Sequence, residues 1–146
     1  DPDRFAEGDW TFKSGFLAMK TILARTREID AVFAACDEMA IGAMKALQSA
    51  GFTIPSDISV IGFDGVPLGV MCSPELTTME QPIVDIGRTA MRMLHRLIQG
   101  GEVTSRQSIL PCRLVERESC RVRLTSSHAY IDEREAVGEK RGAMEG

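Results

Sequence analysis

A short apolar run that ends on a carboxylate constrains this chain more than any other feature. The β-branched and aromatic residues of segment 58–63 stop abruptly at Asp64 and Gly65. Such a run predicts a strand buried on both faces of a sheet. In an open α/β sheet, small ligands bind outside the carboxyl ends of the strands, where a carboxylate accepts hydrogen bonds from hydroxyls or amines. Asp64 is therefore a candidate ligand contact, and the alternative is that it only caps a turn.

Helical and strand-like segments alternate before that run. Apolar residues at helical spacing predict helices from about 11 to 25 and from about 38 to 50. The short apolar run 29–36 lies between them and lacks that spacing, so it predicts a strand. The resulting order of helix, strand, helix and strand is typical of an α/β domain.

The second predicted helix has clear signals at both ends. Asp37 is placed to cap its start, whereas Gly51 and Phe52 fit the left-handed residue and the apolar contact of a Schellman ending. Gly42 is small, which predicts a close approach between this helix and the sheet.

The rest of the chain is less regular. A third helix is predicted from about 82 to 99, and strand-like residues follow at 108–110 and 113–115. Residues 120–146 mix charges with few large apolar side chains, which predicts a poorly ordered tail with one short helix near 131–141.

Composition excludes several classes of function. The net charge is −4 and the basic residues are dispersed, so this piece alone is not expected to bind DNA. No apolar run reaches the roughly eighteen residues of a membrane span, and the start has no signal-peptide pattern. The polar opening without an initiator Met predicts an internal piece of a longer protein. The cysteine pattern favours a cytoplasmic location.

The residues expected in a catalytic or metal site are also missing. The four cysteines form no CxxC pair and no His stands at ligand spacing, so neither a metal site nor a cofactor is predicted. Reduced thiols are the simplest interpretation, although a disulfide pattern stays open. No GxSxG, phosphate-binding GxxxxGK or HExxH motif occurs, and no lysine follows a later strand as a phosphoacceptor pocket requires. The chain is not expected to be an enzyme.

Three motifs in order carry a family resemblance: DEMAIGAMKAL, the segment PSDISVIGFD and LTTMEQP. Together they resemble the effector-binding core of lactose/galactose-repressor-type (LacI/GalR) transcription regulators, over roughly residues 8–119. The resemblance implies an α/β, periplasmic-binding-protein-like fold of type I, a three-layer sandwich with a parallel sheet. Only the C-terminal subdomain and part of the N-terminal subdomain would be present.

The resemblance also implies a division of the chain. Residues 1–80 would form part of the C-terminal, effector-binding subdomain. Residues 81–110 would cross over and place the third helix in the N-terminal subdomain, and 111–119 would return as a strand. Residues 120–146 would form the tail.

Four residues match the family's effector contacts. Trp10 would stack its ring on a sugar or base, with core packing as the alternative, and Asp64 would accept from hydroxyls or amines. Gln81 would reach the cleft from the crossover. Cys36 stands where the lactose-repressor-like pattern has Asn, and a thiol bonds weakly. The effector is therefore left open among a sugar, a sugar acid and a nucleobase.

The implied function is effector binding in a homodimeric regulator that contacts DNA only through an N-terminal domain absent from this chain. Ligand-induced closure of the subdomains would control operator binding. Two alternatives stay open at this point: a periplasmic sugar-binding subunit of a transporter, which shares the fold, and an inert gene fragment.

Overall fold

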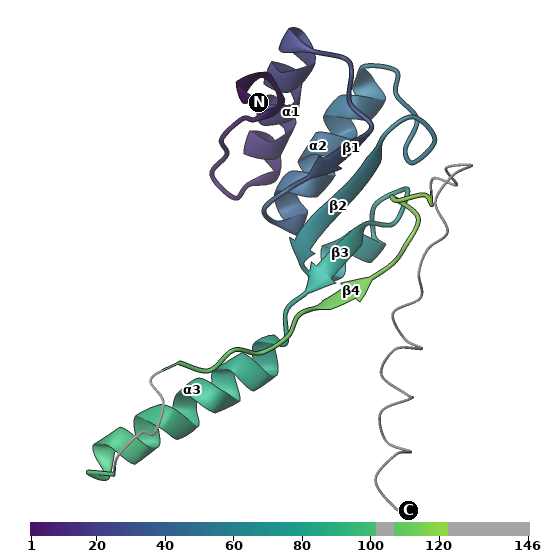
Figure 1. Ribbon diagram of the computed structural model, residues 1–146. Coiled ribbons are helices and arrows are strands. Elements are labelled where there is room, and N and C mark those ends of the chain that lie inside the picture. Colours follow the sequence, from purple (N-terminus) through teal and green to yellow (C-terminus); the bar gives the residue numbers. More distant parts are fainter. Residues whose placement is uncertain (102–106, 123–146) are drawn as a thin grey trace, which may run out of the picture.

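The computed structural model describes residues 1–101 and 107–122 (Figure 1). Single 3₁₀ turns, η1 and η2, cover Pro2–Arg4 and Pro67–Val70. The longer elements in chain order are α1 Phe12–Arg25, β1 Ala31–Phe33, α2 Asp37–Ser49, β2 Ser59–Asp64, β3 Thr77–Glu80, α3 Ile83–Ile98 and β4 Arg113–Val115. All three expected helices within this part of the chain are present, with ends that differ from the prediction by at most one residue.

Local sequence accounts for the ends of the first two helices. The Thr11 hydroxyl accepts from the Ser14 amide at 3.1 Å and starts α1. At the end of α2, Gly51 has a φ of 89°, and the Phe52 amide donates to the Leu47 carbonyl at 3.1 Å. This confirms the predicted Schellman ending.

The four strands form one sheet in the order β1-β2-β3-β4. Strands β1, β2 and β3 are parallel, as the predicted α/β fold requires, whereas β4 pairs with β3 in the antiparallel direction. The sheet is therefore mixed and not wholly parallel. The segment 108–110 is not a strand, so that prediction was wrong, and β3 lies in the LTTMEQP motif, for which no strand was predicted.

Helices α1 and α2 lie together against one face of the sheet (Figure 1). The core between them is apolar and includes Met19, Leu47, Ile58, Val60 and Leu76, each no more than 1% exposed. On the opposite face, Phe33 is 66% exposed. Within the described residues β1 is an edge strand, so one edge and one face of the sheet are open on this side.

Two glycines let α1 and α2 pack backbone to backbone. A Cβ atom on Gly42 would lie 2.1 Å from the Phe12 carbonyl oxygen, and one on Gly15 would lie 2.2 Å from that of Met39. The expectation that Gly42 approaches the sheet was therefore wrong, because its close neighbour is helix α1. A sequence pattern identifies a small residue but not the element that it faces.

The chain returns from β4 through a buried serine. Ser119 is fully buried; its hydroxyl donates to the Val60 carbonyl at 2.6 Å and accepts from the Thr77 amide at 2.8 Å. The Val60 amide in turn donates to the Ser119 carbonyl at 2.8 Å. These bonds fasten residues near 119 across β2 and the start of β3. The tail and its short helix, predicted for 120–146, lie almost wholly outside the described residues.

Helix α3 stands apart from the sheet (Figure 1). None of its residues is buried, although it carries large apolar side chains such as Ile83, Leu94 and Leu97, which are 49–61% exposed. In the described parts of the chain, no helix is long and apolar enough to cross a bilayer.

We predict that Gly42→Ala lowers the free energy of unfolding by about 1–3 kcal/mol, because the new methyl group forces α1 away from α2. Urea denaturation measures the change. Gly87→Ala in α3 is the matched control: its Cβ meets nothing within 4 Å, so it should be neutral or stabilising. Equal destabilisation by both variants would contradict the proposed close packing.

Candidate ligand-binding site

The carboxyl ends of three parallel strands bring the predicted contacts to one edge of the sheet. Cys36 follows β1, Asp64 ends β2 and Gln81 follows β3. Neighbouring parallel strands end at the same edge, so these three residues share it. The structure thus brings three of the four predicted contacts to one end of the sheet, and a ligand site there stays a prediction.

Asp64 and Gln81 form one hydrogen-bonded pair. The Gln81 side-chain amide donates to Asp64 Oδ1 at 2.6 Å, and its backbone amide donates to the Asp64 carbonyl at 3.1 Å. Within the described residues, Asp64 Oδ2 accepts no hydrogen bond. Asp64 also has a φ of 118°, a conformation that costs a non-glycine residue about 1–3 kcal/mol.

Trp10 and Cys36 form a second pair. The Cys36 thiol donates to the Trp10 carbonyl at 3.5 Å, which ties the residues before α1 to the start of α2. Trp10 is 66% exposed and has a φ of 70°. Its ring therefore does not pack in the core and remains free to stack on a flat ligand.

Cys36 caps helix α2, a role that the sequence analysis gave to Asp37. The Met39 amide donates to Cys36 Sγ at 3.4 Å, and Asp37 is the first residue of the helix. The Asp37 prediction was therefore wrong. The Cys36 side chain is 5% exposed and its sulfur bonds on two sides, so it has little capacity left for an effector.

Asp37 is the residue that sequence reasoning missed. It is fully buried, and its carboxylate accepts from the Gly65 and Val66 amides at 2.9 and 2.8 Å and from the Thr78 hydroxyl at 2.5 Å. It thus connects the start of α2 to the loop after Asp64 and to β3. An Asp after an apolar strand is the available signal, but sequence does not show which backbone amides it reaches.

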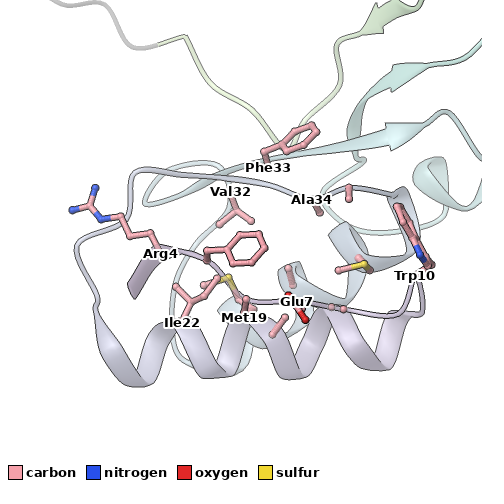
Figure 2. A pocket seen from close by; sticks show the side chains of 16 residues that line it. Arg4, Glu7, Trp10, Met19, Ile22, Val32, Phe33 and Ala34 are labelled. Atoms are coloured by element: carbon pink, nitrogen blue, oxygen red, sulfur yellow. The ribbon is translucent and has the colours of Figure 1, made fainter. Parts of the chain in front are cut away.

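A mostly apolar groove lies beside this edge and not at Asp64. It has a volume of about 420 Å³ and runs between the segment before α1 and strand β1, from Arg4 at one end to Trp10 at the other (Figure 2). Its lining is mostly apolar, with Arg4 and Glu7 as the charged residues, and it does not include Asp64 or Gln81. A sugar needs several converging polar groups, so the groove alone is not a sugar site.

The cysteines show no metal or disulfide chemistry in the described residues. All four are free, and no cluster of His, Cys, Asp and Glu could hold a metal ion there. Burial raises the pKa of the Cys72 thiol above its ordinary value, so this group stays protonated at neutral pH.

The chain is similar in sequence to a known domain family and to bacterial transcription regulators. Residues 2–120 match a family described as the periplasmic binding protein-like domain. The transcriptional repressor CytR of Escherichia coli is 41% identical over 121 residues, which are 83% of this chain and 36% of that protein. Catabolite control protein A of Priestia megaterium is 39% identical over 77% of this chain and 34% of its own length.

Solved structures give the same result. The regulator CelR in a complex with cellobiose superposes with a TM-score of 0.78 at 34% identity, over 82% of this chain and 36% of that one. A lac repressor dimer bound to operator gives a TM-score of 0.74 at 36% identity, over 80% of this chain and 40% of that one.

The chain belongs to the LacI-type periplasmic binding protein-like family. This confirms the resemblance and the α/β fold class drawn from the three motifs. The LacI-type chain spans about a third of the length of the curated relatives that it matches. The chain therefore contains only the part of a ligand site that falls within this third of the relatives' length.

Because Asn is among the best helix N-caps, we predict that Cys36→Asn raises the free energy of unfolding by about 0.5–1 kcal/mol. Cys36→Ala should lower it, since the Met39 amide loses its acceptor. Urea denaturation of both variants measures the difference. If the Asn and Ala variants were destabilised alike, Cys36 would not act as the cap.

Proposed function

We propose that this chain is the effector-binding portion of a DNA-binding transcription regulator. The observation that carries the proposal is the pair of Asp64 and Gln81, hydrogen-bonded at the carboxyl edge of the sheet with one Asp64 oxygen left open. A carboxylate in that position recognises hydroxyl or amine donors on a small molecule.

The chemistry of the edge favours a ligand with both polar and flat surfaces. Asp64 accepts hydrogen bonds, the Gln81 amide both donates and accepts, and the Trp10 ring covers an apolar face. A sugar, a sugar acid or a nucleobase has these features. Two similar structures are complexes with cellobiose and with lactose, which supports testing sugars first.

The remaining parts of the regulator would come from residues outside this chain. In the proposed arrangement, residues 81–110 carry α3 into an N-terminal subdomain, and 111–119 return to the subdomain of residues 1–80. The exposed apolar side chains of α3 support this, because they need a covering surface. DNA would be bound by a separate N-terminal domain in a cytoplasmic homodimer, as the relative bound to operator as a dimer suggests.

Regulation would follow from closure of the two subdomains on the effector. A ligand shifts such an equilibrium only through different affinities for the open and closed states. The coupling between effector and operator is typically about 1–3 kcal/mol, which changes operator affinity from several-fold to about a hundredfold.

Two alternatives differ in what they predict. A transporter subunit would carry a signal peptide upstream, whereas a regulator would carry a helix-turn-helix; the regulators among the relatives favour the latter. An inert fragment would associate through the open face of α3 and show no cooperative melting. A monomer that melts cooperatively in size-exclusion and calorimetric experiments would count against it.

We expect Asp64→Ala in the full-length regulator to abolish the effector response and to leave operator binding intact, because only the ligand loses its acceptor. Fluorescence anisotropy of labelled operator, with and without effector, measures both. Glu28→Ala is the control, since this exposed carboxylate precedes β1 and lies at the end of the strands opposite to Asp64. An unchanged response in Asp64→Ala would remove Asp64 from the site.

The effector itself can be identified by thermal shift of the full-length protein. Cellobiose, lactose, ribose, gluconate, adenosine and cytidine sample the three ligand classes. A ligand present at about a hundred times its Kd should stabilise the protein by about 2.7 kcal/mol. If none of these classes raised Tm, effector binding of the proposed kind would be contradicted.

A further inference from the structure

The buried Asp37 carboxylate joins three segments that are far apart in the sequence. One oxygen, Oδ2, accepts from the amides of Gly65 and Val66, and the other, Oδ1, accepts from the Thr78 hydroxyl. The residue is fully buried at the first position of α2. Amide donors and a helix N-terminus both favour a negative group there, which explains how the carboxylate is accommodated without a cationic partner among the described residues.

Strand β2 is shaped around this carboxylate. A Cβ atom on Gly62 would lie 2.3 Å from Asp37 Oδ1 and 3.0 Å from Leu76 Cδ2. Any residue other than glycine at this position would push the carboxylate away from Thr78. Gly62 therefore makes room for the Asp37 contacts two residues before Asp64.

The Asp37 contacts hold a strained turn. Asp64 has a φ of 118° and Gly65 one of 83°. Backbone in such a region persists only where the surrounding structure over-determines it. The two amides directly after Asp64 are the ones that Asp37 binds, so its carboxylate fixes the direction in which the Asp64 side chain leaves the strand.

Each predicted ligand contact either lies near Asp37 or one of its partners in the sequence, or is hydrogen-bonded to a residue that does. Cys36 precedes Asp37 and bonds the Trp10 carbonyl, while Thr78 stands three residues before Gln81, which bonds Asp64. Thr78 is itself fully buried in β3, the strand that leads into α3. Asp37 and Thr78 therefore connect the carboxyl end of the sheet to the strand that leads into α3.

We propose that Asp37 and Thr78 are positioning residues for the ligand site: Asp37 holds the turn after Asp64, and Thr78 locks Asp37 to the strand that enters the crossover. Neither residue touches the ligand. The part of this proposal that concerns ligand affinity rests on the proposed function, whereas the part that concerns the turn does not.

Hydrogen exchange tests the turn without any ligand. In Asp37→Ala, the Gly65 and Val66 amides lose their acceptor and should exchange at least about tenfold faster than in the parent protein. Asp37→Asn keeps a carbonyl oxygen for these amides and should stay near the parent rate. Ser119→Ala is the stability control, because it removes a fully buried hydroxyl that bonds β2 and β3 elsewhere. The same exchange rates in Asp37→Ala and Ser119→Ala, after correction for global unfolding, would overturn the proposal.

Ligand affinity is tested on the full-length protein with the sugar or nucleoside that gives the largest thermal shift in the panel above. Asp37→Ala should weaken binding by about tenfold or more, whereas Ser119→Ala should leave the affinity unchanged at temperatures where both are folded. Equal affinities in the two variants would overturn a positioning role. A panel in which no compound binds contradicts the proposed function instead, and leaves the exchange experiment to decide the role of Asp37 in the turn.

A second pair of variants covers the case in which Asp37→Ala does not fold. Thr78→Val has a similar volume but no hydroxyl, so Asp37 Oδ1 loses its donor. Thr78→Ser restores the hydroxyl. We expect weaker ligand binding and faster Gly65 and Val66 exchange in the Val variant, with recovery in the Ser variant. If Val and Ser behaved alike, Thr78 would have no part in positioning.

Discussion

The hydrogen bonds of one buried carboxylate determine how the candidate site is assembled. Asp37 replaces water with two backbone amides and a threonine hydroxyl, which meets the general requirement that a buried polar group be fully bonded. Because its partners come from the loop after β2 and from β3, the start of α2 cannot move independently of either. The absence of a side chain at Gly62 is part of the same arrangement.

The packing of α1 against α2 also holds residues of the candidate site in place. Gly15 and Gly42 bring α1 and α2 close together, so Trp10, two residues before α1, can reach the cap of α2 at Cys36. A bulky residue at either glycine would separate these partners as well as lower stability. Packing in the core and geometry at the site are therefore linked through the same two helices.

Much of the fold was predictable because its signals are local. Helical spacing, the Schellman ending at Gly51 and the strand before Asp64 depend on neighbours in the chain, and all three were found. The errors concern contacts between distant residues. Gly42 faces a helix where a sheet was expected, and β3 became a strand only because β2 and β4 pair with it.

The site divides in the same way. Motif order indicated Asp64 and Gln81, and the structure shows them in contact. Motif order did not indicate the role of Asp37, since hydrogen bonds to amides 28 and 29 residues away leave no periodic pattern. Cys36 was predicted as an effector contact, whereas in the structure its sulfur caps helix α2.

Within the described residues, the outer edge of β1 has no partner strand and Phe33 is exposed on the uncovered face of the sheet. Unpaired strand edges act as templates for association, and parallel sheets are normally covered on both faces. Copies of this part of the chain are therefore expected to aggregate through β1 unless another segment or chain covers that edge and face.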